Sequence, residues 1–124
     1  MLKISENAAS VYLANQYSEI KEEINELYAH KNFAGIFQAI VNHINSLISK
    51  KQTQKIGVRI KFIGWLYKRG NEYVQYIVEN LFVQSFKGMK KRGTTEQWLY
   101  IYKIIPKNLK TIYLLQNKNY LIQK

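Results

Sequence analysis

The stretch KIGVRIKFIGWLYKRGNEYVQYIVENLFVQSFKGMKKRG, residues 55–93, decides the fold. On both sides of Gly70, apolar residues recur every three or four positions, which is the spacing of helices that bury one face. Gly70 predicts a left-handed helix C-terminus, and Asn71 predicts the N-cap of the next helix. The stretch therefore predicts two antiparallel helices, over residues 55–69 and 72–91, that pack as a hairpin.

Helical spacing continues outward from this hairpin in both directions. The further helices are expected over residues 5–28, 33–48 after an N-cap at Asn32, 94–105, and from Pro106 onward. Thr94 with Gln97 three residues later forms a capping-box pattern, and Pro106 is preorganised for a first helical turn. The sequence predicts an all-α fold, a five- or six-helix bundle with a central antiparallel helical hairpin, in which residues 1–124 form a single helical domain.

The C-terminal third admits a second interpretation. Residues 98–102 and 111–115 are rich in strand-forming side chains, and residues 116–119 fit a hairpin turn before residues 120–122. The capping box at Thr94 and the proline at Pro106 favour helices over this hairpin.

The expected helix over residues 55–69 is apolar almost all round. One face carries Ile56, Ile60, Ile63 and Tyr67, and the opposite face carries Val58, Phe62 and Trp65. Such a helix is either central to the bundle or half-buried in an interface. Gly57 and Gly64 fall on one side and predict the close approach of a neighbouring backbone. Arg59 lies between the two faces and predicts either an ion pair, with Glu79 or an N-terminal glutamate, or a side chain that reaches solvent at the rim.

A family resemblance rests on the second half of the chain. Its residues are WLYKRGN at 65–71, then Val74, IVENLFVQSF at 77–86, Trp98, Pro106, Leu109 and Tyr113. Over about the last 60 residues the sequence resembles a family of small uncharacterised all-helical bacterial proteins. The resemblance implies a helical fold, and it implies no activity, substrate or catalytic residue.

Charge is unevenly distributed along the chain. Residues 31–124 carry 17 Lys and Arg against 3 Glu, whereas residues 1–30 carry 2 Lys against 5 Glu. An acidic partner is therefore expected to meet the C-terminal three quarters. Ile, Lys, Asn and Tyr supply 53 of the 124 residues, a bias that an AT-rich coding sequence produces by itself. The number of lysines alone is thus weak evidence for binding.

The densest basic cluster predicts a nucleic-acid surface as an alternative function. It consists of Lys87, Lys90, Lys91 and Arg92, with Trp98 and Tyr100 nearby in sequence for base stacking. No recognition-helix or ribonucleoprotein motif accompanies it. A structural explanation also fits, because cations in the last turn of a helix are favoured by its dipole.

The first-choice function is a non-catalytic protein-interaction module, with another protein or a second copy in a homodimer as the partner. Tyr76 and Val83, seven residues apart and flanked by Tyr73 and Asn80, are expected to form an exposed stripe opposite the core face of the helix over residues 72–91. The alternative is that the N-terminal helix covers this stripe within the same chain.

Several functional classes are disfavoured. Without Cys or Asp, and without a nucleophile motif or phosphate loop, the sequence predicts no catalytic residue, no enzyme activity and no cofactor. Glu22, Glu26 and His30 share one side of a helix, but one helix cannot complete a metal site, so none is predicted. Polar residues interrupt the longest uncharged stretch, residues 32–49, and no secretory signal is recognisable, so we expect a cytoplasmic protein without membrane partners.

Overall fold

The computed structural model describes residues 2–122, with side chains as far as Lys118. Within this part the chain is all-α, as predicted, and the only β-type contact is an isolated bridge between Ile4 and Gly70. The α-helices are α1 (Glu6–Gln16), α2 (Lys21–Ala29), α3 (Phe33–Ser49), α4 (Gly57–Arg69), α5 (Glu72–Ile77), α6 (Phe86–Arg92), α7 (Thr95–Ile104) and α8 (Lys107–Ile122). Short 3₁₀ turns are Ser18–Ile20, Thr53–Lys55 and Val83–Ser85, and Val78–Phe82 is a π-helical turn.

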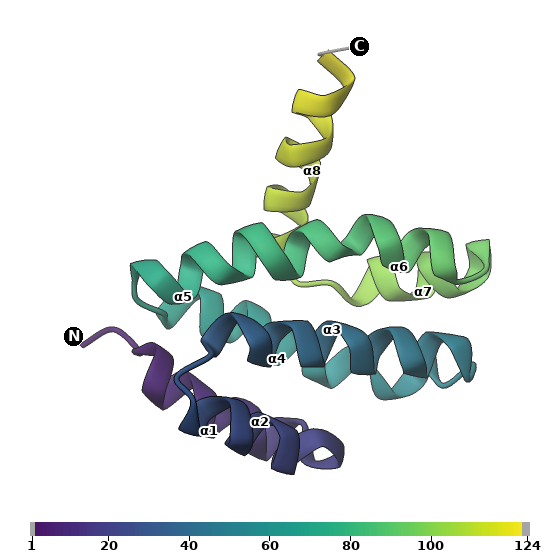
Figure 1. The fold of residues 1–124 in the computed structure, drawn as a ribbon. Helices are drawn as coiled ribbons and strands as arrows, with labels where there is room; N and C mark the ends of the chain where they lie inside the picture. The colour runs from purple at the N-terminus through teal and green to yellow at the C-terminus, as the bar shows by residue number, and fades with distance from the viewer. Residues whose placement is uncertain (1, 123–124) are drawn as a thin grey trace.

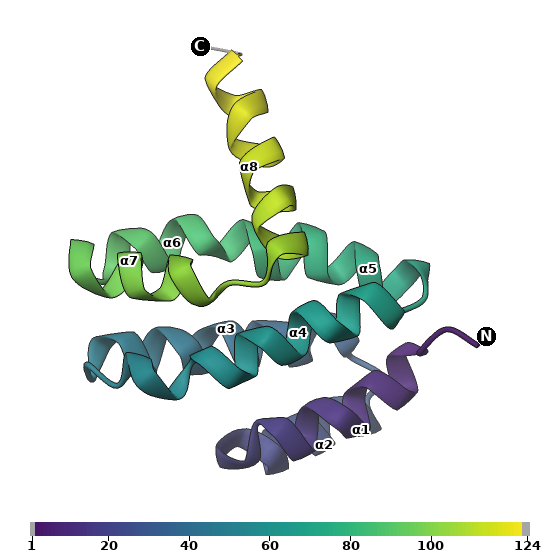
Figure 2. The same ribbon diagram turned by 180° about the vertical axis from the view of Figure 1, so that it is seen from behind.

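The helices stack in layers, and the last one projects from them. The α1–α2 pair, the α3–α4 pair, and the continuous α5–α6 segment with α7 follow one another across the molecule (Figure 1). Helix α8 contacts these layers near its N-terminal end and as far along as Gln116, which donates to the Glu79 carbonyl, and its C-terminal end points away from them (Figures 1 and 2). The layers enclose one apolar core, to which α3 contributes the largest set of buried side chains.

The predicted caps are confirmed. Asn32 Oδ1 accepts from the Gly35 amide at 2.9 Å, and Asn71 Oδ1 accepts from the Val74 amide at 2.9 Å. At Thr94 both hydrogen bonds of the capping box are formed. Each cap uses a side-chain oxygen to satisfy one of the amide groups that a helix N-terminus leaves without a partner, so it depends only on local sequence.

The prediction of a left-handed residue at Gly70 is wrong. Gly70 is extended, with φ −75° and ψ 155°, because its strand-like neighbours pair with the N-terminal segment: the Ile4 amide donates to Arg69 O, and the Asn71 amide donates to Ile4 O, both at 2.8 Å. A side chain at position 70 would collide with Val74, since an added Cβ would lie 2.5 Å from its Cγ1. Gly70 is required for space and not for a positive φ.

The predicted helix over residues 72–91 is continuous but irregular. In its middle, the amide of Val83 donates to the carbonyl of Val78, five residues earlier, and so closes a π-helical turn. One extra residue in a turn rotates every later side chain by about 100° relative to a regular helix. The face predicted from the start of this helix therefore shifts at Val83, which is fully buried.

Helix α4 is packed as closely as its glycines predicted. Ile60 and Ile63 are fully buried. A Cβ at Gly64 would lie 2.6 Å from Pro106 Cγ, and one at Gly57 would lie 3.1 Å from Ile104 Cδ1. The two glycines thus let α7 and the start of α8 lie directly on α4.

The C-terminal third is helical, so the strand interpretation of residues 98–122 is wrong. In the described residues, no helix combines the length and apolar content needed to cross a bilayer.

Candidate interaction surfaces

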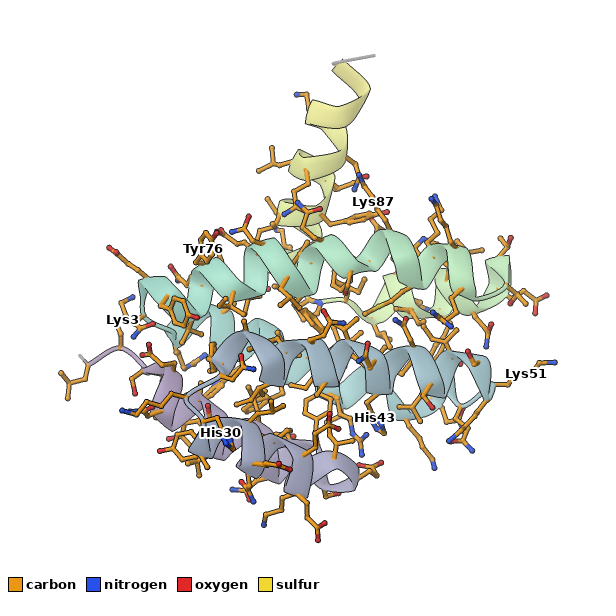
Figure 3. All side chains as sticks on the ribbon, viewed as in Figure 1. Lys3, His30, His43, Lys51, Tyr76 and Lys87 are labelled. Carbon is orange, nitrogen blue, oxygen red and sulfur yellow. The ribbon has the colours of Figure 1, made fainter. Side chains whose placement is uncertain are left out.

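The predicted partner stripe on α5 is only partly exposed. Tyr76 is 58% exposed and points outward from α5 (Figure 3), and Asn80 is also exposed, donating from Nδ2 to the Tyr76 carbonyl at 2.9 Å. Tyr73 is half-exposed and packs its ring against Phe33, with ring centroids 5.8 Å apart. Val83 is fully buried, so the expectation that it lies on the exposed side is wrong.

The π-helical turn explains the error at Val83. In a regular helix, residues seven apart lie on nearly the same side, but the turn at Val78–Phe82 rotates Val83 into the core and leaves Gln84 exposed. The intramolecular cover comes from α8, which packs against the turn Val83–Ser85 and donates from Gln116 Nε2 to the Glu79 carbonyl at 3.0 Å. The N-terminal helix α1 packs against α5 but leaves Tyr76 exposed, so the alternative in which it covers the stripe is wrong.

The second apolar face of α4 lies at the surface beside α1. Val58 is 74% exposed, and Trp65 is 39% exposed. The Trp65 ring stacks on Phe62, with centroids 5.4 Å apart, and meets the Tyr12 ring of α1 edge-on at 6.1 Å. Since α1 and α4 lie side by side (Figure 2), their side chains form one surface, which we call the aromatic face: Tyr12, Val58, Phe62 and Trp65.

Basic side chains border the aromatic face. The Arg69 guanidinium lies over the Trp65 ring, 4.7 Å from its centroid, which is a cation–π contact. Lys61 and Lys68, both exposed, follow Val58 and Trp65 by three residues each and so lie along one edge of the same helical stripe. The sequence identified the α4 residues of this face, but the contribution of Tyr12 depends on the docking of α1.

A second surface is a groove between α6 and α8. It encloses about 610 Å³ and is lined by Lys87, Lys90, Lys91, Tyr113 and Asn117. Lys87 lies on α6 beside the base of α8 (Figure 3). The groove brings together three of the four predicted nucleic-acid-binding residues. The fourth, Arg92, is exposed at the end of α6 and is not among the lining residues.

The aromatic residues near this basic cluster differ from those expected. Trp98 is 8% exposed and packs against the rings of Tyr102 and Tyr113, so it is not free to stack on a base. Tyr100 is half-exposed on α7. The ring in the groove is instead that of Tyr113, and burial raises the pKa of its hydroxyl. Sequence spacing did not reveal Tyr113 because it lies 22 residues beyond Lys91 in the chain.

A polar cluster joins α4 to the turn that follows α1. Arg59 Nη2 donates to both carboxylate oxygens of Glu19, at 2.5 and 2.6 Å, and Nη1 donates to His43 Nε2 at 3.1 Å. The hydrogen bonds from Arg59 hold the pKa of Glu19 below its usual value, and burial lowers the pKa of His43. His43 lies on the side of α3 that faces the α1–α2 layer (Figure 3). Of the two predicted partners of Arg59, the N-terminal glutamate is the one used.

Glu79, the other predicted partner of Arg59, accepts instead from the Tyr67 hydroxyl at 2.5 Å. Burial, together with this hydrogen bond, raises the pKa of Tyr67 to about 12. Among the described residues, no group of three or more His, Cys, Asp or Glu side chains is arranged to hold a metal ion. His30 Nδ1 lies 3.0 Å from the carbonyl of Glu26.

Comparison with protein-family models matches residues 11–120 to a domain of unknown function, DUF7674. The match extends well beyond the last 60 residues on which the resemblance was based. Neither the curated proteins nor the solved structures contain a match to the chain. The expected uncharacterised, all-helical family is confirmed, and its bacterial origin stays a prediction.

Proposed function

This chain belongs to the DUF7674 family, a domain of unknown function, and on that premise we propose that it is a non-catalytic protein-interaction module. The observation that carries the proposal is the aromatic face, where Val58 and Trp65 stay exposed on a helix whose other side is core. Large apolar side chains that gather at the surface are characteristic of binding sites. Trp, Tyr and Arg are also the residues most enriched among energetically dominant interface positions.

The partner that best fits this face is an amphipathic helix of another protein with acidic residues beside its apolar stripe. Its apolar side chains would cover Val58 and Trp65, and its carboxylates would meet Lys61, Lys68 and Arg69. Self-association through the aromatic face is less favourable than binding of such an acidic helix. Two copies related by a two-fold axis would bring the same basic edge together in a protein of net charge +11.

The proposal also includes the expectations on enzyme activity, cofactors, localisation and the number of helices in the bundle. We propose that the protein is not an enzyme, needs no cofactor and acts in the cytoplasm, where the absence of cysteine fits a reducing compartment. We also propose the finer description of the fold, a five- or six-helix bundle whose central antiparallel hairpin is α4 with the α5–α6 segment. Tyr73, Tyr76 and Asn80 stay predicted as additional partner contacts.

Site-directed photo-crosslinking in the native host tests the proposal. A photoreactive amino acid replaces Val58, and in the control it replaces Leu99, which is 61% exposed on α7 and distant from the aromatic face in sequence. We expect an adduct with a distinct protein from position 58 only. The partner is then identified, purified and titrated against the wild type, Val58→Glu, and the double variant Lys61→Glu, Lys68→Glu.

Both variants are expected to weaken binding at least tenfold, by burying a charge or by reversing the basic edge. Because all three positions are exposed, circular dichroism melts should match the wild type. Recovery of a second copy of this chain as the adduct would replace the proposal by a homodimer. Identical adducts from positions 58 and 99, or a partner segment without acidic residues, would refute it.

A further inference from the structure

We infer that the groove between α6 and α8 binds single-stranded nucleic acid through its phosphate backbone. This site lies on different helices from the aromatic face and does not depend on the function proposed for that face. The inference rests on the joint placement of three lysines, one aromatic ring and one amide side chain around a single groove of about 610 Å³.

The lysines are arranged to act together on a linear anion. Lys87, Lys90 and Lys91 occupy positions i, i+3 and i+4 of α6, so they project from neighbouring points of the same helix face. Among the described residues that line the groove, none is acidic. The exposed charges of Lys90 and Lys91, side by side at this face, attract phosphate groups, and binding is driven by the counterions that the phosphates release.

Tyr113 provides a feature that an acidic peptide would not use. Its ring lines the groove and also packs at tilted angles against Phe86, Trp98 and Tyr102, whose centroids lie 5.8, 6.0 and 6.3 Å away. A ring fixed in this way is a stacking platform, because every nucleic-acid base has a π face to place on it. Asn117, one turn further along α8, adds an amide side chain beside the ring.

The concave shape of the site favours a single strand over a duplex. Proteins that read a duplex insert a helix or a β-ribbon into the major groove, so their recognition surface is convex. Here the lysines and Tyr113 line a hollow between two helices, which a flexible strand can enter with its bases unstacked.

Fluorescence anisotropy with a labelled oligothymidine of about 20 nucleotides tests the inference at two salt concentrations. The groove variant is Lys90→Gln with Lys91→Gln, both exposed at the end of α6. The matched control is Lys50→Gln with Lys51→Gln, an adjacent exposed pair that follows the C-terminus of α3. Both variants lose the same charge near a helix C-terminus, so any difference between them reports on position.

We expect the groove variant to bind about tenfold more weakly and to lower the salt slope by about 1.4, since each phosphate contact to a single strand contributes about 0.7. The control should stay within about threefold of the wild type. An abasic oligomer of equal length should bind several-fold more weakly, because it cannot stack on Tyr113. Equal losses of affinity in the groove variant and the control variant would overturn the inference, because the lysine charges would then contribute to binding regardless of their position. Equal binding of the abasic oligomer, or displacement of oligothymidine by polyglutamate at equal charge, would also overturn it.

Discussion

Arg59 of α4 holds the carboxylate of Glu19 with two hydrogen bonds, at 2.5 and 2.6 Å, although 40 residues separate them in the chain. The Arg59 side chain is 16% exposed, and its guanidinium also lies over the ring of Tyr17, 5.5 Å from the centroid. The Tyr17 hydroxyl in turn donates to the Arg59 carbonyl at 3.1 Å. These contacts fasten the end of α1 to α4 and so position α1 for its part in the aromatic face.

Removing the charge of Glu19 should therefore destabilise the protein. Glu19→Gln leaves the mostly buried guanidinium of Arg59 without its carboxylate, and we expect a loss of about 1 kcal/mol, a value reduced because Glu19 itself is partly exposed. The control is Glu23→Gln, which removes the same charge from an exposed position of α2 and should change stability by less than about 0.5 kcal/mol. Urea denaturation of both variants measures the difference. Equal stability losses would show that Glu19 acts only through net charge.

Acidification should destabilise the protein in two stages. The folded pKa of His43 lies below its ordinary value of 6.5, so the unfolded chain takes up the proton first and stability falls as pH drops through this range. Protonated His43 also cannot accept the hydrogen bond from Arg59. The folded pKa of Glu19 lies below 4.5, so its contribution is present above that value and is lost as pH falls through the folded pKa.

The variant His43→Gln separates the two stages. Its amide oxygen can accept from Arg59 but does not titrate. Melting temperatures between about pH 7.5 and about pH 5 should fall less in this variant than in the wild type, with the later stage unchanged. A fall of the same size in both proteins would exclude His43 as the source of the first stage.

Two glycines in helices should respond oppositely to the same substitution. Gly64→Ala places a Cβ 2.6 Å from Pro106 Cγ, so α8 must shift, and we expect a loss of about 1–3 kcal/mol. Gly88→Ala meets no atom within 4 Å and should gain about 0.5–1 kcal/mol from helix propensity. Thermal melts compare the two. Stabilisation by Gly64→Ala would contradict close packing of α8 on α4.

Substitutions at Tyr76 and Val83, the two ends of the predicted stripe, should differ in their effect on stability. Val83 is fully buried, so Val83→Glu puts an unpaired charge into the core and should prevent folding or lower the melting temperature sharply. Tyr76→Glu changes an exposed side chain and should stay within about 1 kcal/mol of the wild type. Circular dichroism melts distinguish the two variants. A stable Val83→Glu protein would contradict the rotation of Val83 by the π-helical turn.

Much of the fold was predictable because helices depend on local sequence. A helix cap requires only a side-chain oxygen three residues before an unpaired amide, as at Asn32, Asn71 and Thr94. The apolar spacing of residues 33–48 predicts a helix directly because every turn there is regular. The same spacing identified Val58, Phe62 and Trp65 as a second apolar face of α4. The sequence by itself therefore determined the all-α class and the faces of the regular helices α3 and α4, but it missed the break at Tyr17 that divides the helix expected over residues 5–28 into α1 and α2.

Tertiary structure decided whatever depended on contacts between distant residues. The pairing of Gly70 with Ile4 replaced the expected left-handed turn by an extended one, and the π-helical turn at Val78–Phe82 moved Val83 from the surface to the core. The docking of α8 brought Tyr113 to Lys90 and Lys91, and the docking of α1 brought Tyr12 to Trp65. A prediction from helical periodicity assumes that every turn is regular. It therefore misses an inserted residue, and it does not identify which distant side chain fills a space in the core. Those choices are made when the whole core packs.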